Sequence, residues 1–152
     1  MTSVLERLTE RGITLPSVVP PVAAYVPAVR SGSYVYVSGQ IPLAEGKILA
    51  TGKLGREIST ERGAELARQC GLNALAAVHD LVGLDNITRV VKLVGFVASA
   101  EGFTEQPAVI NGASLLMVEV FGDAGRHARS AVGVAELPLG VPVEVEVIVE
   151  VS

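Results

Sequence analysis

The alternation at the C-terminus constrains the fold of this chain most. From position 143 to 151 a valine stands at every second position, and three glutamates and one isoleucine stand between the valines. Successive side chains of a strand point to opposite faces of a sheet. The pattern therefore predicts a half-buried strand with its valines in the core and Glu144 on the other face.

A second alternating run, 128–134, comes just before it. Here Arg129 shares one face with Ala131 and Gly133, and Ser130 shares the other with two valines. We expect a strand whose valines point inward and whose arginine faces away from them. A guanidinium among such small side chains would have room for a ligand.

The residues between the two runs, 137–142, include two prolines and a glycine, so we expect the runs to form an antiparallel pair with a short connection. In a plain hairpin, Arg129 and Glu144 would be offset by about seven residues, roughly 20 Å. They could then cooperate only across a subunit boundary in a symmetric oligomer.

The rest of the chain predicts alternating strands and helices. Helical spacing and capping residues indicate helices, and β-branched runs indicate strands. The expected helices are 3–11, 59–82 and 107–121, and the expected strands are 23–29, 34–38, 48–51 and a central one, 89–97. Tyr25 falls on the first strand. We expect an α+β fold, a mixed sheet with two helices on one face and the other face left for an oligomer interior.

Composition excludes several classes of protein. The length of 152 residues suits one domain, and the chain is 49% hydrophobic but only 18% charged, which favours burial of surface against copies of itself. A net charge of −4 and few aromatic residues argue against nucleic-acid binding as the main function. One cysteine, Cys70, and two histidines predict no metal site. We expect no signal peptide, no membrane span and a cytoplasmic location.

Three segments carry a family resemblance. They are Tyr34-Val35-Tyr36-Val37-Ser38-Gly39-Gln40-Ile41-Pro42, then Ala128-Arg129-Ser130-Ala131-Val132, and Leu137-Pro138 followed by Val143-Glu144-Val145-Glu146. Together they resemble the YjgF/YER057c/UK family, also called RidA (reactive intermediate deaminase) or endoribonuclease L-PSP. The resemblance covers about residues 23 to 151. It divides the chain into an N-terminal helix and proline-rich extension, 1–22, and a YjgF/RidA-like domain, 23–152.

The resemblance implies a chorismate-mutase-like fold, a homotrimer and clefts between subunits. It also implies hydrolysis of 2-imino or 2-enamino acids to 2-oxo acids and ammonia, without metal or organic cofactor. By motif, Arg129 would bind the substrate carboxylate as a bidentate fork and Glu144 would hold or activate water. The cleft would also be lined by Tyr25, Ser38, Gly39, Asn111, Ser130 and Ala131.

The chain departs from the family pattern next to the arginine. Where many deaminase members carry a cysteine and an acidic residue, this chain has Ala131 and Gly133. Two alternatives therefore stay open beside the hydrolase: a non-catalytic protein that binds a small carboxylate metabolite, and an endoribonuclease or translation inhibitor. His127, close to Arg129, could tune the site, but a lone histidine at a loop end is more often exposed, which is the expectation here.

Overall fold

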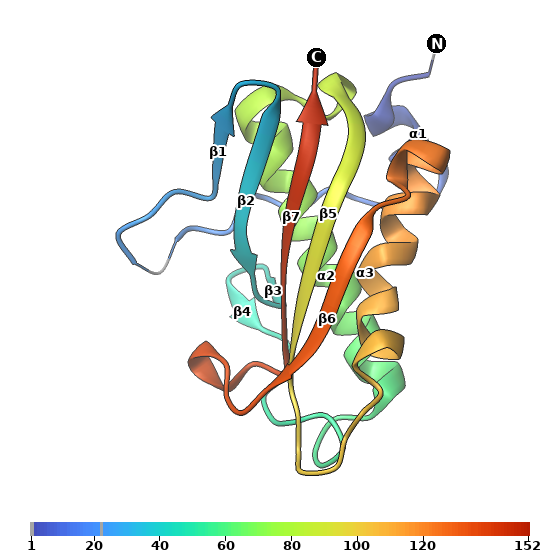
Figure 1. The fold of residues 1–152 in the computed structure, drawn as a ribbon. Coiled ribbons are helices and arrows are strands. Elements are labelled where there is room, and N and C mark those ends of the chain that lie inside the picture. The colour runs from blue at the N-terminus through green and yellow to red at the C-terminus, as the bar shows by residue number, and fades with distance from the viewer. Residues whose placement is uncertain (1, 22) are drawn as a thin grey trace.

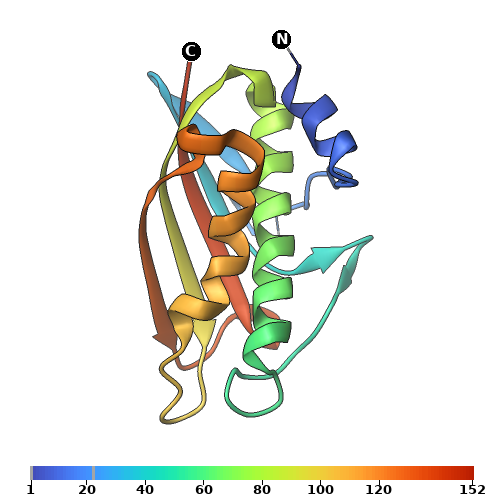
Figure 2. The ribbon, with the colours of Figure 1, turned by 90° about the vertical axis from the view of Figure 1, so that its right-hand side faces the viewer.

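A computed structural model describes residues 2–21 and 23–152. One face of a five-stranded sheet is covered by two long helices, and the other face is free of helices (Figures 1 and 2). The helices are α1 (Val4–Glu10), α2 (Thr60–Val82) and α3 (Gln106–Phe121), with short 3-10 turns η1 (Leu84–Asn86), η2 (Gly122–Gly125) and η3 (Pro138–Gly140). The strands are β1 (Ala28–Ser31), β2 (Tyr34–Gln40), β3 (Leu43–Ala44), β4 (Lys47–Ile48), β5 (Ile87–Ala98), β6 (Ala128–Val134) and β7 (Val143–Val151).

The expected pairing of the last two strands is wrong. The strand order is β1-β2-β7-β5-β6, so β5 lies between β6 and β7. It pairs in parallel with β6 and antiparallel with β7. A twelve-residue strand with apolar residues on both faces is best satisfied by a partner on each side, and the connection 135–142 is long enough to pass one strand. The mixed α+β sheet itself is confirmed.

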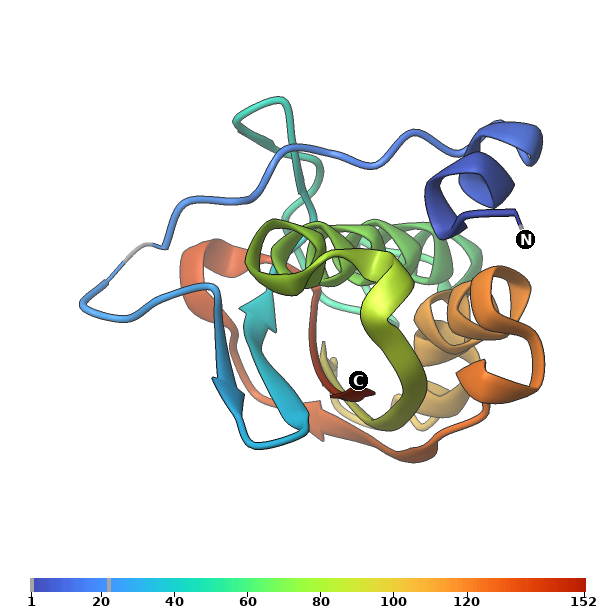
Figure 3. The same ribbon diagram turned by 90° about the horizontal axis from the view of Figure 1, so that it is seen from above.

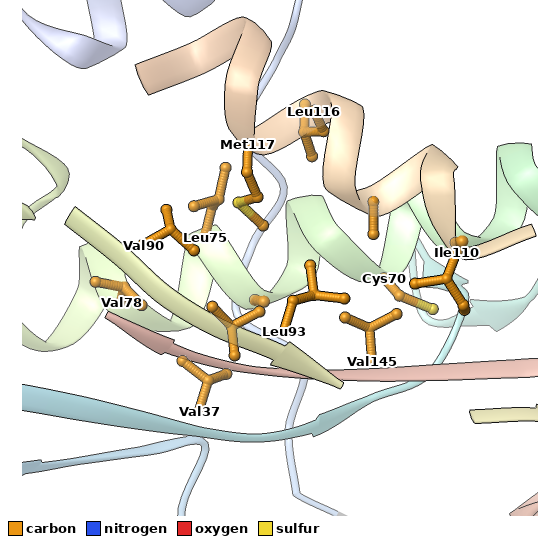
Figure 4. Packing of buried hydrophobic residues seen from close by; sticks show 14 of the residues in the cluster. Val37, Cys70, Leu75, Val78, Val90, Leu93, Ile110, Leu116, Met117 and Val145 are labelled. Carbon is orange, nitrogen blue, oxygen red and sulfur yellow. The ribbon is translucent and has the colours of Figure 1, made fainter. Parts of the chain in front are cut away.

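The core lies between the sheet and the two long helices. The five valines of β7 are all buried, as expected, and pack with Leu93 of β5 against Cys70 and Met117 from the helices (Figure 4). Helix α2 begins where the sequence predicts, because the Ser59 hydroxyl accepts a hydrogen bond from the Arg62 amide. The core therefore fixes both helices against one face of the sheet.

Helices α2 and α3 approach very closely. At Gly112 the backbone of α3 lies so near Ala64 that a Cβ on the glycine would come within 1.9 Å of the Ala64 carbonyl oxygen. The clash would be with backbone, which cannot rotate away. Only glycine at position 112 therefore permits this spacing of the two helices.

The N-terminal segment packs on the helical layer. Val4 and Leu8 of α1 are buried in the same core as the sheet, and residues 11–21 then run across the outer side of α2 (Figure 3). Strand β1 starts later than expected, so Tyr25 lies in a bend before it. Pro27 contributes no amide hydrogen for an earlier start of the strand. The expected third strand is instead the separate hairpin β3–β4.

One segment, Gln106–Gly125, is long and apolar enough to cross a membrane by length and composition alone. It contains α3, whose inner face is buried in the core at Val109, Ala113 and Leu116, among others. Its apolarity is thus explained by packing inside the fold.

We predict that Gly112→Ala lowers the free energy of unfolding by about 2 kcal/mol or more, because the new methyl group meets backbone. Gly71→Ala in α2 is the matched control. There the nearest atom is a Leu116 methyl at 3.1 Å, so the change should stay within about 1 kcal/mol of zero. Urea denaturation of both variants measures the difference, and equal losses would contradict the prediction.

Candidate functional site

The side chain of Arg129 is held by α3. Its Nη1 donates to Asn111 Oδ1 at 2.8 Å and to Ser114 Oγ at 3.3 Å. No carboxylate among residues 2–21 and 23–152 forms an ion pair with it. The positive charge of Arg129 is therefore oriented by neutral groups and left uncompensated.

The face on which Arg129 lies differs from the expectation. Arg129 lies on the helical face together with the half-buried Ala131, whereas Val132 is 44% exposed on the helix-free face. The reason is that β6 is an edge strand, so its inner positions meet α3 and need small side chains. Nor is the space over Gly133 open to a ligand, because the Gln106 amide occupies it.

Small residues on the sheet bring α3 within reach of the arginine. Gly95 of β5 is paired with Ala131, and a Cβ on it would come within 2.4 Å of Ile110. Ile110 therefore packs directly on the β5 backbone, and its neighbour Asn111 is placed over the sheet edge. The short side chains thus position α3 for the hydrogen bonds to Arg129.

His127 and Ser114 extend this group. The Nε2 atom of His127 lies 2.9 Å from Ser114 Oγ, and Nδ1 lies 2.6 Å from the Gly125 carbonyl oxygen. His127 is half-buried with both ring nitrogens in hydrogen bonds, so the expectation of an exposed histidine is wrong. We call Arg129, Asn111, Ser114 and His127 the arginine group.

A second group of predicted residues forms around Glu144 on the helix-free face. Strand β2 bulges against β7 between Val37 and Gln40, and Gly39 lies in the bulge. A Cβ at Gly39 would come within 2.0 Å of the Glu144 Oε1 atom. The absence of a side chain at Gly39 therefore allows the carboxylate to lie against the bulged backbone.

Burial raises the pKa of the Glu144 carboxyl above its usual value, and the negative charge of nearby Glu146 raises it further. A half-buried carboxyl with a raised pKa gives up its proton less readily than a free glutamate and can act as either a base or an acid. This places Glu144 among the residues suited to acid–base chemistry.

The side chain of Glu144 lines a cavity, and part of the wall of that cavity comes from the N-terminal segment. Tyr25 and Gly39 line it with Glu144, and Val19, Pro20, Pro21 and Leu139 supply apolar walls. Ser38 stands beside it, and its hydroxyl donates to the Val26 carbonyl, which ties down the segment that carries Tyr25. We call Tyr25, Gly39 and Glu144 the glutamate group.

The arginine and glutamate groups do not meet within one chain. Arg129 is paired with Leu93 of β5, and Leu93 is paired with Val147 of β7. The backbone of Glu144 is thus two strands across and three residues along from that of Arg129, a separation of about 14 Å by strand geometry. The two side chains also lie on opposite faces of the sheet. They are thus separated, as expected, but by an intervening strand and not by a hairpin offset of seven residues.

The two remaining predicted site residues lie on opposite faces of β6. Ser130 is exposed on the helix-free face, and Ala131 packs against the core beneath α3. Among the described residues, no three His, Cys, Asp or Glu side chains gather as a possible metal site. Cys70 is fully buried, which raises the pKa of its thiol.

The prediction missed Ser114 and the apolar cavity wall as site residues. Ser114 stands three positions after Asn111, so helical spacing alone places both on one face of α3. The wall from Val19 to Pro21 had no local signal, because it depends on the path of an irregular segment around α2.

Comparison with known proteins gives one family and several full-length relatives. The family model described as Endoribonuclease L-PSP matches residues 16–151. Protein TCP17 of Trypanosoma cruzi is 45% identical over 98% of this chain and 94% of its own length. A protein of Dermatophagoides farinae named 2-iminobutanoate/2-iminopropanoate deaminase is 33% identical over 94% of this chain and 98% of its own.

The fold is also shared with solved structures. The protein Atu1372 of Agrobacterium tumefaciens, described as of unknown function, superimposes with a TM-score of 0.90 at 47% identity. The match covers 99% of this chain and 94% of that one. The relationship therefore includes the N-terminal segment as well as the sheet and its helices.

We predict that the pKa of Glu144 lies above the ordinary value of a glutamate and that Glu146→Gln lowers it, because the substitution removes a nearby negative charge. Since the folded-state pKa is raised, Glu144 contributes stability at pH values below its unfolded pKa. That contribution is lost as pH rises through the folded value. Carbon-detected NMR titration of labelled glutamate measures both points, and an unchanged Glu144 pKa in the variant would contradict the charge effect.

Proposed function

Because the chain belongs to the Endoribonuclease L-PSP family, we propose that it hydrolyses small 2-imino and 2-enamino acids to 2-oxo acids and ammonia. The reaction would take place in clefts between the copies of a homotrimer, without metal or organic cofactor. The relative from Dermatophagoides farinae bears the name of such a deaminase, which supports this choice within the family.

The uncompensated charge of Arg129 is the observation that carries the proposal. Both hydrogens of Nη1 point to neutral acceptors on α3, and no carboxylate of the described residues pairs with the guanidinium. A partly buried guanidinium of this kind is suited to a carboxylate ligand, which it can bind through two parallel hydrogen bonds. All 2-imino and 2-oxo acids carry that carboxylate.

Association of copies would unite the arginine group with the glutamate group of a neighbour. The helix-free face exposes large apolar side chains, with Val29 at 51%, Tyr36 at 47% and Val132 at 44% exposure. A soluble chain is expected to cover such a surface. Arg129 lies at the β6 edge of the sheet, where the neighbouring copy would bring Glu144.

The chemistry then follows from the two groups. Arg129 would hold the carboxylate, and Glu144 of the neighbour would take a proton from water as the oxygen adds to the imine carbon. Glu144 would return that proton to the nitrogen, which gives a carbinolamine. It would then pass the proton of the new hydroxyl group to the nitrogen as the carbon–nitrogen bond breaks. Ammonia leaves and the carbonyl of the 2-oxo acid forms. An enamine would first take up a proton at carbon to become the imine.

The apolar wall of the cavity favours a small substrate with an uncharged side chain. We do not propose an RNA substrate, because the net charge of −4 gives no general attraction for phosphates. We propose a cytoplasmic location.

We predict that Arg129→Ala abolishes both turnover and ligand binding, whereas Glu144→Gln lowers kcat by about 100-fold or more and leaves binding of a 2-oxo acid nearly unchanged. A coupled assay that generates the imino acid from an amino acid measures turnover, and calorimetry with 2-oxobutanoate measures binding. Arg126→Ala and Glu150→Gln are the matched controls, and both should behave like the wild type.

Release of 2-oxo acid no faster than in buffer would contradict the hydrolase. If 2-oxobutanoate still bound through Arg129, the protein would be a carboxylate-binding module of the same fold. Full turnover by Arg129→Ala would contradict the assigned role of the arginine.

We predict a homotrimer in solution, which Val132→Glu dissociates because it places a charge on the apolar helix-free face. Leu81→Glu is the matched control, since Leu81 of α2 is also 44% exposed but lies on the helical layer. Light scattering should give three chain masses for the wild type and the control. A monomeric wild type would rule out the shared cleft.

A further inference from the structure

We propose that Ser114 and His127 are positioning residues that set the orientation of the Arg129 guanidinium and so give the protein its affinity for carboxylates. The inference rests on the proposed function only in taking Arg129 as the carboxylate site. It does not depend on whether the bound acid is hydrolysed. The contact from His127 through Ser114 to Arg129 carries it.

The direction of each hydrogen bond follows from the partners. The carbonyl oxygen of Gly125 can only accept, so Nδ1 of His127 must carry the hydrogen that points to it. In the neutral ring Nε2 is then an acceptor, and the Ser114 hydroxyl donates to it. With its hydrogen used in this way, Ser114 Oγ presents lone pairs to Arg129.

This direction matters because a serine in a helix has another option. Its hydroxyl commonly donates to the carbonyl four residues earlier, which would here be that of Ile110. The contacts of Ser114 are instead with His127 and Arg129. His127 therefore selects the rotamer in which the oxygen of Ser114 faces the guanidinium.

Of the three guanidinium nitrogens of Arg129, only Nη1 donates hydrogen bonds to α3. Nη1 carries two hydrogens, and Asn111 and Ser114 accept one each. The three remaining donors, on Nε and Nη2, have no partner among the described residues. The Nε hydrogen and one Nη2 hydrogen lie parallel along one edge of the planar guanidinium, where they match the two oxygens of a carboxylate.

Two acceptors fix the plane of the guanidinium better than one. With Asn111 alone, the group could rotate about its Nη1 contact, and the free edge would no longer have a single direction. Ordering it would then have to occur on ligand binding, at a cost in conformational entropy. Ser114 and His127 thus supply preorganisation without touching the ligand.

The test measures binding of 2-oxobutanoate and turnover of the imino acid by the intact protein. We expect Ser114→Ala and His127→Ala each to raise the Kd for 2-oxobutanoate by about tenfold. KM should rise with it while kcat changes less than about twofold, because the carboxylate is bound equally in ground and transition states. Ser114→Thr, which keeps the hydroxyl, should restore most of the affinity.

A double-mutant cycle separates positioning from general damage. Since His127 reaches Arg129 only through Ser114, His127→Ala should have little further effect in the Ser114→Ala background. The neutral analogue 2-oxobutanamide cannot use the charged edge, so its weak binding should be the same in wild type and variants. Arg126→Ala, which removes a neighbouring exposed cation, should leave the Kd unchanged.

Full His127→Ala effects in the Ser114→Ala background, or wild-type affinity in Ser114→Ala, would overturn the inference. So would a wild-type protein that binds no 2-oxobutanoate. A protein that binds 2-oxobutanoate with the expected pattern of variants but hydrolyses no imine would sustain the positioning roles while the proposed hydrolase fails. Melting temperatures of all variants identify any that fail to fold. If Ser114→Ala does not fold, Ser114→Cys takes its place, because a thiol is only a weak hydrogen-bond donor and acceptor and should also raise the Kd.

Discussion

Burial of the β7 valines against α2 and α3 is the interaction on which the rest of the structure depends. Because side chains alternate along a strand, packing the valines inward forces Glu144 and Glu146 onto the opposite, helix-free face. The same layer of helices provides the acceptors that orient Arg129. The packing of one strand therefore divides the candidate site between the two faces of the sheet. The arginine group and the glutamate group of one chain cannot contact the same small ligand.

The two halves differ in how they are built. The glutamate group rests on backbone irregularity, since a bulge in β2 and the missing side chain of Gly39 let a carboxylate lie against the main chain. The arginine group rests on regular structure, since Asn111 and Ser114 are one helical turn apart on α3. A charge held by a helix and a proton acceptor placed at a bulge suit a division of labour between binding and chemistry.

Local patterns in the sequence predicted the elements well, and non-local contacts explain the failures. The capping by Ser59 and the alternation of β7 involve only residues close together in sequence, so the start of α2 and the buried face of β7 were predictable. Which strand lies beside β6 depends on β5, more than thirty residues away in sequence, and nothing near Arg129 shows it. The face of Arg129 and the burial of His127 depend in turn on where α3 packs. Family resemblance supplied the candidate site residues, and the offset between the two alternating runs predicted that Arg129 and Glu144 would not meet within one chain. Neither showed that the two side chains lie on opposite faces of the sheet.

The tight contact between Gly112 and Ala64 has a consequence beyond stability. Gly112 lies between Asn111 and Ser114, so the backbone of α2 determines the height at which these two acceptors stand over the sheet edge. Under the proposed carboxylate binding, variation at Ala64, which forms no hydrogen bond with Arg129, would be limited by the affinity for that carboxylate. The spacing of α2 and α3 would then be under selection for ligand binding, although no residue of α2 belongs to the arginine group.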